Sequence, residues 1–115
     1  MATATATVKI EIEMADLLSA VYSNLMADTS SWVKSLDFDW QNNDGTEKVK
    51  VKFLDPDNYP KVKTKTVTPQ MLLKAFEACL GKTIWGQVVT PDFMFDCLVS
   101  DYILQMALFG KEVYA

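Results

Sequence analysis

The stretch Asp101-Tyr-Ile-Leu-Gln-Met-Ala-Leu-Phe-Gly110-Lys-Glu-Val-Tyr114 decides how this chain folds. It has the form of the last turns of a helix that ends at Gly110, followed by a short apolar tail that closes the fold. Residues 90–92, Thr-Pro-Asp, supply a cap and then a proline at the first helical position, so we predict one helix from there to Gly110. Apolar side chains surround nearly all of this helix. Such a helix lies either at the centre of a fold or against a partner chain.

The rest of the chain shows the alternation typical of strands and the apolar stripes typical of helices. One helix follows the apolar positions from Met14 to Leu25, and a second begins at Thr68-Pro69 and ends near Gly81. Residues 84–89 are either extended or a loop with an anchored tryptophan. The predicted strands cover Val8–Ile12, Trp32–Trp40, Val49–Phe53 and Tyr59–Val67.

This order, β-α-β-β-β-α-α, predicts an α+β fold in which an antiparallel sheet has helices packed on one face. The length of 115 residues is that of one domain, so we assign residues 1–115 to a single domain and expect residues 1–6 to be frayed. Half of the residues are apolar and the net charge is only −4, which is a globular composition. No apolar run is long enough to span a membrane, and the start lacks the features of a secretory signal.

The chain contains no histidine and no arginine. Histidine is the commonest residue in catalytic triads, in zinc sites and in proton transfer near neutral pH. Arginine is the residue that binds phosphates and carboxylates through two parallel hydrogen bonds. These absences argue against an enzyme, and we expect no catalytic residue, no metal and no cofactor. Cys79 and Cys97 are expected to be free thiols, with a disulfide between them as the alternative.

Six of the eleven lysines form two alternating triplets in neighbouring strands: Lys48, Lys50, Lys52, Lys61, Lys63 and Lys65. Residues 46–66 therefore carry a charge of +3, against −7 for the rest of the chain. If the two strands pair in antiparallel fashion, we expect both triplets to share one face. The resulting stripe could bind phosphates of a nucleic acid or a nucleotide. The alternative is a solvated outer face whose lysines protect a sheet edge.

Asp101 and Gln105 lie one helical turn apart in the closing helix, and Tyr102 lies beside them in the sequence. As a site, these residues could hold a hydroxyl or amide of a ligand at the edge of an apolar pocket. As structure, the carboxylate and the amide would bond the backbone of a neighbouring loop, because buried polar groups need partners.

The closing residues resemble the ending of a family of small uncharacterised proteins from bacteriophages and prophages, at Asp101, Gln105, Ala107–Gly110 and Val113-Tyr114. The start is similar too, with Val8–Ile12, an acidic residue (Asp16) in the first helical turn and a tryptophan (Trp32) after that helix. The resemblance covers both ends of the chain. It implies a viral origin and a setting in the host bacterial cytoplasm, where small accessory phage proteins often bind and inhibit host factors.

These observations lead to the hypothesis of a non-enzymatic phage accessory protein that acts by binding. It would inhibit a host defence protein or sequester the nucleotide signal of that defence. Two alternatives stay open, namely nucleic-acid binding through the face of the Lys48–Lys65 hairpin and a role in the virion or its assembly. We expect no membrane partner. Because the last helix is apolar nearly all round, we also expect a homodimer, with interface residues Leu104, Leu108, Phe109 and Trp40.

Overall fold

The computed structural model describes residues 4, 10–27, 32–38, 46–93 and 95–114. This part of the chain contains the helices α1 (Met14–Ala27), α2 (Pro69–Cys79) and α3 (Cys97–Phe109). The strands β1 (Val33–Phe38), β2 (Val49–Leu54) and β3 (Val62–Val67) form an antiparallel sheet in the order β1-β2-β3. A second, two-stranded sheet consists of β4 (Thr83–Ile84) and β5 (Gln87–Val88). The predicted α+β class, with its antiparallel meander, is confirmed.

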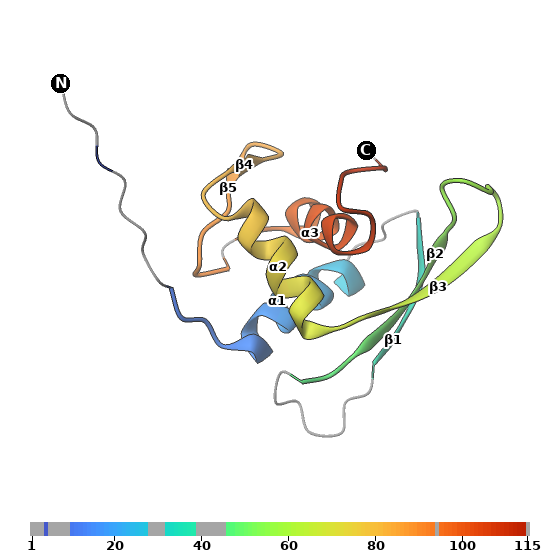
Figure 1. Cartoon of the computed structure of the whole chain (residues 1–115), viewed down its shortest axis with the longest axis horizontal. Coiled ribbons are helices and arrows are strands. Elements are labelled where there is room, and N and C mark those ends of the chain that lie inside the picture. Colours follow the sequence, from blue (N-terminus) through green and yellow to red (C-terminus); the bar gives the residue numbers. More distant parts are fainter. Residues whose placement is uncertain (1–3, 5–9, 28–31, 39–45, 94, 115) are drawn as a thin grey trace.

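Helix α3 lies at the centre of the molecule (Figure 1). Helices α1 and α2 both pack against it, and it also contacts strand β3. The side chains of Val99, Ile103 and Leu104 on α3 are completely buried. The apolar surface of this helix is thus covered by the chain itself, which is the first of the two explanations that its sequence allowed.

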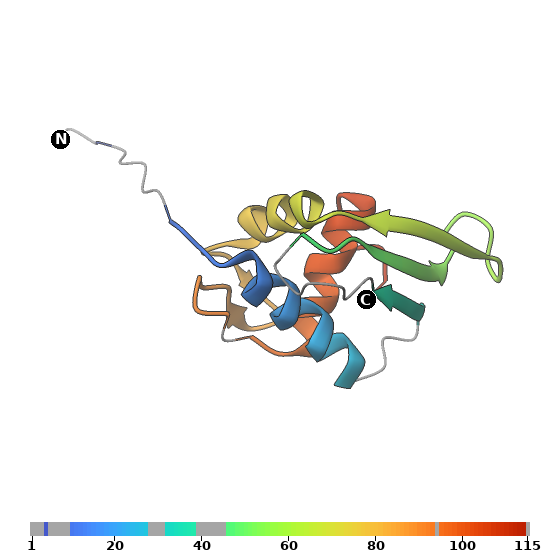
Figure 2. The same ribbon diagram turned by 90° about the horizontal axis from the view of Figure 1, so that it is seen from below.

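One face of the sheet is buried against the helices. In β2, Val49, Val51 and Phe53 are buried, whereas Lys50 and Lys52 between them are exposed. Strand β3 is exposed along nearly its whole length. The β2–β3 hairpin accordingly projects from the helical body, with its connecting turn at the far end (Figure 2).

Helix α2 begins at the predicted residues. The hydroxyl of Thr68 accepts a hydrogen bond from the N–H of Met71 (3.2 Å), and Pro69 occupies the first turn, where its missing N–H is not needed. Leu72 and Phe76, one turn apart, are buried and give the helix its inner face.

Helix α3 begins later than its sequence suggested, so the expected start at residues 90–92 is wrong. Asp96 is the N-cap, and its carboxylate accepts from the N–H groups of Leu98 (3.0 Å) and Val99 (3.5 Å). Phe93 has a φ of +60°, in the left-handed region, which a right-handed α-helix cannot contain. Its N–H donates to the carbonyl of Thr90, so residues 90–93 form a turn ahead of the helix.

The end of helix α3 at Gly110 is confirmed. Gly110 has a φ of +75°, and its N–H donates to the carbonyl of Met106 (3.0 Å). A left-handed residue just after the helix satisfies one of the last carbonyls and turns the chain back, and glycine adopts this conformation without strain. The tail, residues 111–114, can therefore fold back over the side of α3.

The segment Val8–Ile12, predicted as the first strand, is only partly described. Residues 8 and 9 lie outside the described part of the chain, and residues 10–12 pair with none of the described strands. The carbonyl of Glu13 accepts from the N–H groups of Asp16 (3.1 Å) and Leu17 (3.2 Å), so the chain passes directly into α1. Residues 1–6, apart from Ala4, and the predicted turn at residues 41–45 also lie outside the described residues.

Candidate binding surfaces

Asp101 and Gln105 hold the C-terminal tail against helix α3. The amide nitrogen of Gln105, a residue only 1% exposed, donates to the carboxylate of Asp101 (2.6 Å) and to the carbonyl of Tyr114 (2.7 Å). The amide oxygen accepts from the N–H groups of Val113 and Tyr114, both at 2.7 Å. All four hydrogen-bonding positions of this amide are therefore filled within the chain.

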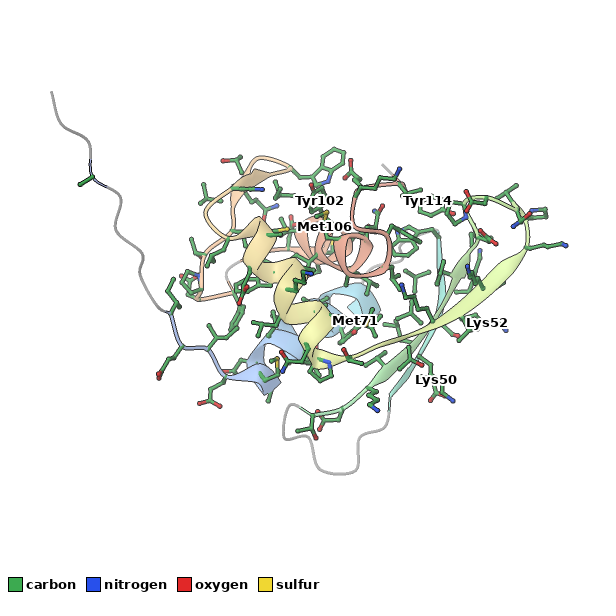
Figure 3. All side chains as sticks on the ribbon, viewed as in Figure 1. Lys50, Lys52, Met71, Tyr102, Met106 and Tyr114 are labelled. Atoms are coloured by element: carbon green, nitrogen blue, oxygen red, sulfur yellow. The ribbon has the colours of Figure 1, made fainter. Side chains whose placement is uncertain are left out.

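The same carboxylate anchors an aromatic cluster. The indole N–H of Trp32 donates to the two oxygens of Asp101 (3.2 and 3.0 Å), and the indole stacks on the ring of Tyr114, with centroids 5.4 Å apart and planes at 6°. Phe109 packs on Trp32 with centroids 5.8 Å apart. The hydroxyl of Tyr114, which Figure 3 places beside the sheet, donates to the carbonyl of Leu54 in β2 (2.8 Å). The tail thus ties α3 to the sheet.

We call Trp32, Asp101, Gln105 and Tyr114 the tail clasp. Its polar groups bond other parts of the same chain, which corresponds to the structural interpretation of Asp101 and Gln105. Tyr102, predicted with them, is half-buried on the side of α3 that also carries Met106 one turn later (Figure 3). The stretch from Asp101 to Tyr114 therefore includes residues that close the fold.

The two lysine triplets do not share a face, so that expectation is wrong. The register pairs Lys50 with Thr66 and Lys52 with Thr64, which puts these lysines on the solvent face (Figure 3). Lys65 lies opposite Val51, and Lys63 lies opposite the buried Phe53. Those two lysines therefore belong to the face that bears the core. Lys48 and Lys61 are exposed and lie just outside the strands.

Lys65 has a structural contact of its own. Its ammonium group donates to the carbonyl of Leu108 (3.2 Å), one of the last carbonyls of α3. A positive charge at a helix C-terminus is favourable because the helix dipole is negative there. On the solvent face, Lys50 lies opposite Asp37 of β1, a cross-strand pair of opposite charge. The positive stripe is therefore divided between two faces and partly offset by an acid.

The residues proposed for a dimer interface are mostly used inside the chain. Leu104 is fully buried and Leu108 is 6% exposed, so neither can contact a second copy in this fold. Phe109 is half-buried and packs on Trp32 and on Phe53. Trp40 lies outside the described residues. The expectation that Leu104 and Leu108 form an interface is wrong, because α1, α2 and the sheet already cover α3.

The β4–β5 hairpin carries exposed residues that no sequence pattern marks as a site. Two residues, Trp85 and Gly86, connect its strands, and both have positive φ, at 50° and 78°. A two-residue loop with two positive φ values is the type I′ turn, whose twist matches that of the flanking strands. The sequence signal for this turn is Gly86, which directly follows Trp85 and lies between the two short strands. Asn, rather than Trp, is the residue usually found at the first position of such a turn.

Trp85 combines backbone strain with exposure. A bulky residue in the left-handed region is strained, and Trp85 is nevertheless 52% exposed. Phe93 shares the positive φ, but its half-buried ring packs on Phe76 with centroids 5.3 Å apart, so core packing offsets its strain. The Trp85 indole N–H donates to the carboxylate of Glu112 (3.1 Å), which fixes the ring without covering it.

Two contacts place this hairpin alongside α3. The side chain of Gln87 accepts from the N–H of Asp96 at the start of the helix (3.1 Å), and Trp85 bonds Glu112 just beyond its end. Within two residues of these contacts lie four of the exposed large apolar side chains, which we call the Trp85 surface: Trp85, Val88, Leu98 and Val113. Trp85 and Val88 belong to the same hairpin, and exposed apolar side chains are candidates for contact with a partner.

Two buried groups elsewhere belong to the core. Burial raises the pKa of the Tyr22 hydroxyl far above its ordinary value, so the phenol stays neutral. Burial also raises the pKa of the Cys79 thiol, and no disulfide joins Cys79 to Cys97. Among the described residues, no three His, Cys, Asp or Glu side chains lie close enough together to hold a metal ion.

No helix in the described part of the chain has the length and apolar character needed to span a membrane. Comparisons with protein-family models, with curated protein sequences and with solved structures gave no significant match.

Proposed function

We propose that this chain is a non-enzymatic accessory protein of a bacteriophage that acts by binding in the host cytoplasm. The binding would inhibit a host defence protein or sequester its nucleotide signal. The Trp85 surface is the contact region that we assign to this function. The observation that carries the proposal is the tryptophan held half exposed at a strained turn position.

Tryptophan is among the residues most often responsible for the affinity of a protein interface, because a large rigid ring buries much area at little entropic cost. The Glu112 carboxylate orients the Trp85 ring before any partner arrives. A contact residue already held in place loses less conformational entropy on binding. Val88, about half exposed and in the same hairpin, would add apolar area beside it.

Two further observations support binding rather than catalysis. The chain lacks histidine and arginine, the residue types most used for proton transfer and for bidentate phosphate recognition. The amide of Gln105 and the carboxylate of Asp101, the polar groups of the closing motif, are already bonded within the tail clasp. Neither is arranged to bind a substrate. The phage origin rests on the resemblance of the chain's two ends.

The lysine hairpin gives weaker support to nucleic-acid binding. Only Lys50 and Lys52 in the strands face solvent together, and Asp37 lies opposite Lys50. A phosphate platform gains affinity from several cations on one surface, and this face offers few.

The test compares wild-type protein with Trp85→Asn in host lysate. Asn is suited to the turn, so the variant keeps the fold while it removes the ring. We expect wild type to retain a defence protein, or a nucleotide that mass analysis identifies after denaturation, and the variant to retain neither. Lys74→Ala, at an exposed position of α2, serves as the control that keeps binding. Equal retention by wild type and Trp85→Asn, or retention of nothing together with no change in a phage-defence assay, would contradict the proposal.

A further inference from the structure

The outer edge of strand β3 is open along the described part of the chain. The sheet order is β1-β2-β3, so β3 pairs with β2 on one side and with no described strand on the other. Residues 62–66 are all exposed. The hairpin projects from the helical body (Figure 2), and α3 reaches β3 at Lys65, whose ammonium group donates to the carbonyl of Leu108. An open edge is a template to which another extended chain can add a strand.

The register identifies which backbone groups are open. The N–H of Asp55 donates to the carbonyl of Lys61 (2.9 Å), so this pair and every second pair after it exchange hydrogen bonds. The backbone groups of Lys63 and Lys65 consequently point toward β2. Those of Val62, Thr64 and Thr66 point outward, where they offer alternating donors and acceptors. We call these three residues, with their outward backbone groups, the β3 edge.

The side chains beside this edge are strongly basic. Lys61, Lys63 and Lys65 alternate with the edge residues, and Lys50 and Lys52 lie on the solvent face one strand away. The division of the lysines between two faces weakens a flat phosphate platform. The same division favours binding of a ligand that lies along the edge, because lysines from both faces of the sheet can reach such a ligand. The exposed Tyr59, at 74% exposure, stands in the turn at one end of the edge.

We propose that the β3 edge binds an extended acidic peptide segment of a partner protein, which adds to the sheet as a fourth strand. The added strand would place acidic side chains at every second position, opposite Lys61 and Lys63, whereas the ammonium group of Lys65 is bonded to the Leu108 carbonyl. Its remaining positions would face Val62, Thr64 and Thr66, where β-branched residues pack well on neighbouring strands.

Charge gives this site its selectivity. Lysines along an edge repel a second copy of the same basic edge, which prevents the sheet from pairing with itself. An acidic strand relieves this repulsion and also gains the backbone hydrogen bonds of the edge. A nucleic acid could meet the lysines, but it lacks the alternating amide groups that match the backbone of Val62, Thr64 and Thr66.

The test is a fluorescence-anisotropy titration of the full chain with a labelled peptide that alternates glutamate with valine or threonine. We expect saturable binding that weakens as salt is added, because the contacts are ionic. A peptide of the same composition with its glutamates in one block should bind at least about tenfold more weakly, since it cannot match the alternation. A single-stranded oligonucleotide should bind no better than the blocked peptide.

Thr64→Pro is the variant that separates edge binding from simple charge attraction. The N–H of Thr64 points away from β2, so proline there removes an outward donor and leaves the β2–β3 ladder intact. We expect an unchanged fold by circular dichroism and at least about tenfold weaker peptide binding. Lys63→Glu should also weaken binding, whereas Lys74→Glu, on the exposed side of α2, changes the net charge equally and should leave binding unchanged.

Three outcomes would overturn the proposal. These are no binding of the alternating peptide, equal affinity for the oligonucleotide, and a folded Thr64→Pro variant that binds like wild type. The site is distinct from the Trp85 surface, so Trp85→Asn should leave peptide binding unchanged. A failure at the β3 edge therefore leaves the proposed function standing, and the reverse also holds.

Discussion

Trp85 combines a strained backbone conformation with an exposed side chain. The left-handed backbone of residue 85 suits Asn, Asp or Gly, and a tryptophan there is strained by roughly 1–2 kcal/mol. Strained residues persist where the surrounding structure holds them and often mark functional positions. Because the ring is half exposed, core packing does not explain the choice of tryptophan.

The first prediction is that Trp85→Asn stabilises the fold. Relief of the turn strain should raise the free energy of unfolding by up to about 1 kcal/mol, after subtraction of the small contribution of the exposed bond to Glu112. Urea denaturation followed by circular dichroism measures this change. Gly86→Ala is the control with the opposite expected sign. The added Cβ would meet no atom within 4 Å, but the φ of +78° is strained for alanine. This variant should destabilise by about 1 kcal/mol. A marked loss of stability in Trp85→Asn would mean that the ring serves the fold.

The second prediction concerns Gln105, whose amide bonds the tail through both of its ends. Gln105→Leu keeps the size of the side chain but leaves the N–H groups of Val113 and Tyr114 without their acceptor. We expect a loss of about 2–3 kcal/mol in the free energy of unfolding, or a released tail. Denaturation measures the loss, and a shift in Trp32 fluorescence reports the lost stacking on Tyr114.

Tyr114→Phe is the control for this experiment. It removes only the hydroxyl bond to the carbonyl of Leu54 and keeps the stacked ring, so it should cost about 1 kcal/mol. If Gln105→Leu were no worse than Tyr114→Phe, the tail clasp would not be a main support of the fold.

At the scale of elements, local signals located most helix ends but not the start of α3. Thr68-Pro69 and residues 90–92 carry the same cap-then-proline pattern, yet only the first begins a helix. The difference lies in Phe93, whose ring is drawn toward Phe76 and whose backbone turns left-handed. That packing is tertiary, so residues 90–92 alone could not reveal it. Asp96, with its carboxylate on two helical N–H groups, became the cap instead.

The third prediction tests this cap. Hydrogen bonding by the Gln87 side chain, and then by the N–H groups of Leu98 and Val99, holds the pKa of Asp96 below its ordinary value of 3.8. A lowered pKa stabilises the fold above pH 3.8, and this contribution is lost as the pH falls through the lower, folded-state pKa. Asp96→Ala should cost about 1 kcal/mol at neutral pH. Asp96→Asn should retain most of the cap and lose the corresponding acid dependence, as thermal melts between pH 2 and pH 7 would show. Equal pH profiles for wild type and Asp96→Asn would contradict this assignment.

The strands show a second limit of pattern-based prediction. Alternation correctly predicted β2 and β3 and their antiparallel pairing, and it correctly gave lysines a common face within each strand. It could not show which face of β2 lies beside which face of β3, because that depends on the length and shape of the turn at residues 55–61. Because Val51 pairs with Lys65 and Lys50 pairs with Thr66, the triplets fall on opposite faces.

At the scale of the whole molecule, the fold class followed from the element order, whereas the apolar sequence of α3 left two possibilities, a central position and a dimer interface, and the structure shows the central position. The tail clasp was within reach of the sequence only as one of two interpretations of Asp101 and Gln105, because hydrogen-bond partners are set by tertiary packing. The exposed Trp85 was not anticipated, since one tryptophan in a short loop carries no periodic signal.

The account depends on the Trp85 surface being a contact site for a host molecule. The most direct measurement places a photoreactive residue at Val88, which is exposed beside Trp85, and irradiates the protein in lysate of the host bacterium. We predict one specific crosslinked product that is suppressed by excess unlabelled wild type but not by excess Trp85→Asn. The same photoreactive residue at Lys74 on α2 should give no such product. Products that do not depend on position, or that Trp85→Asn suppresses as well as wild type does, would contradict the assignment of binding to this surface.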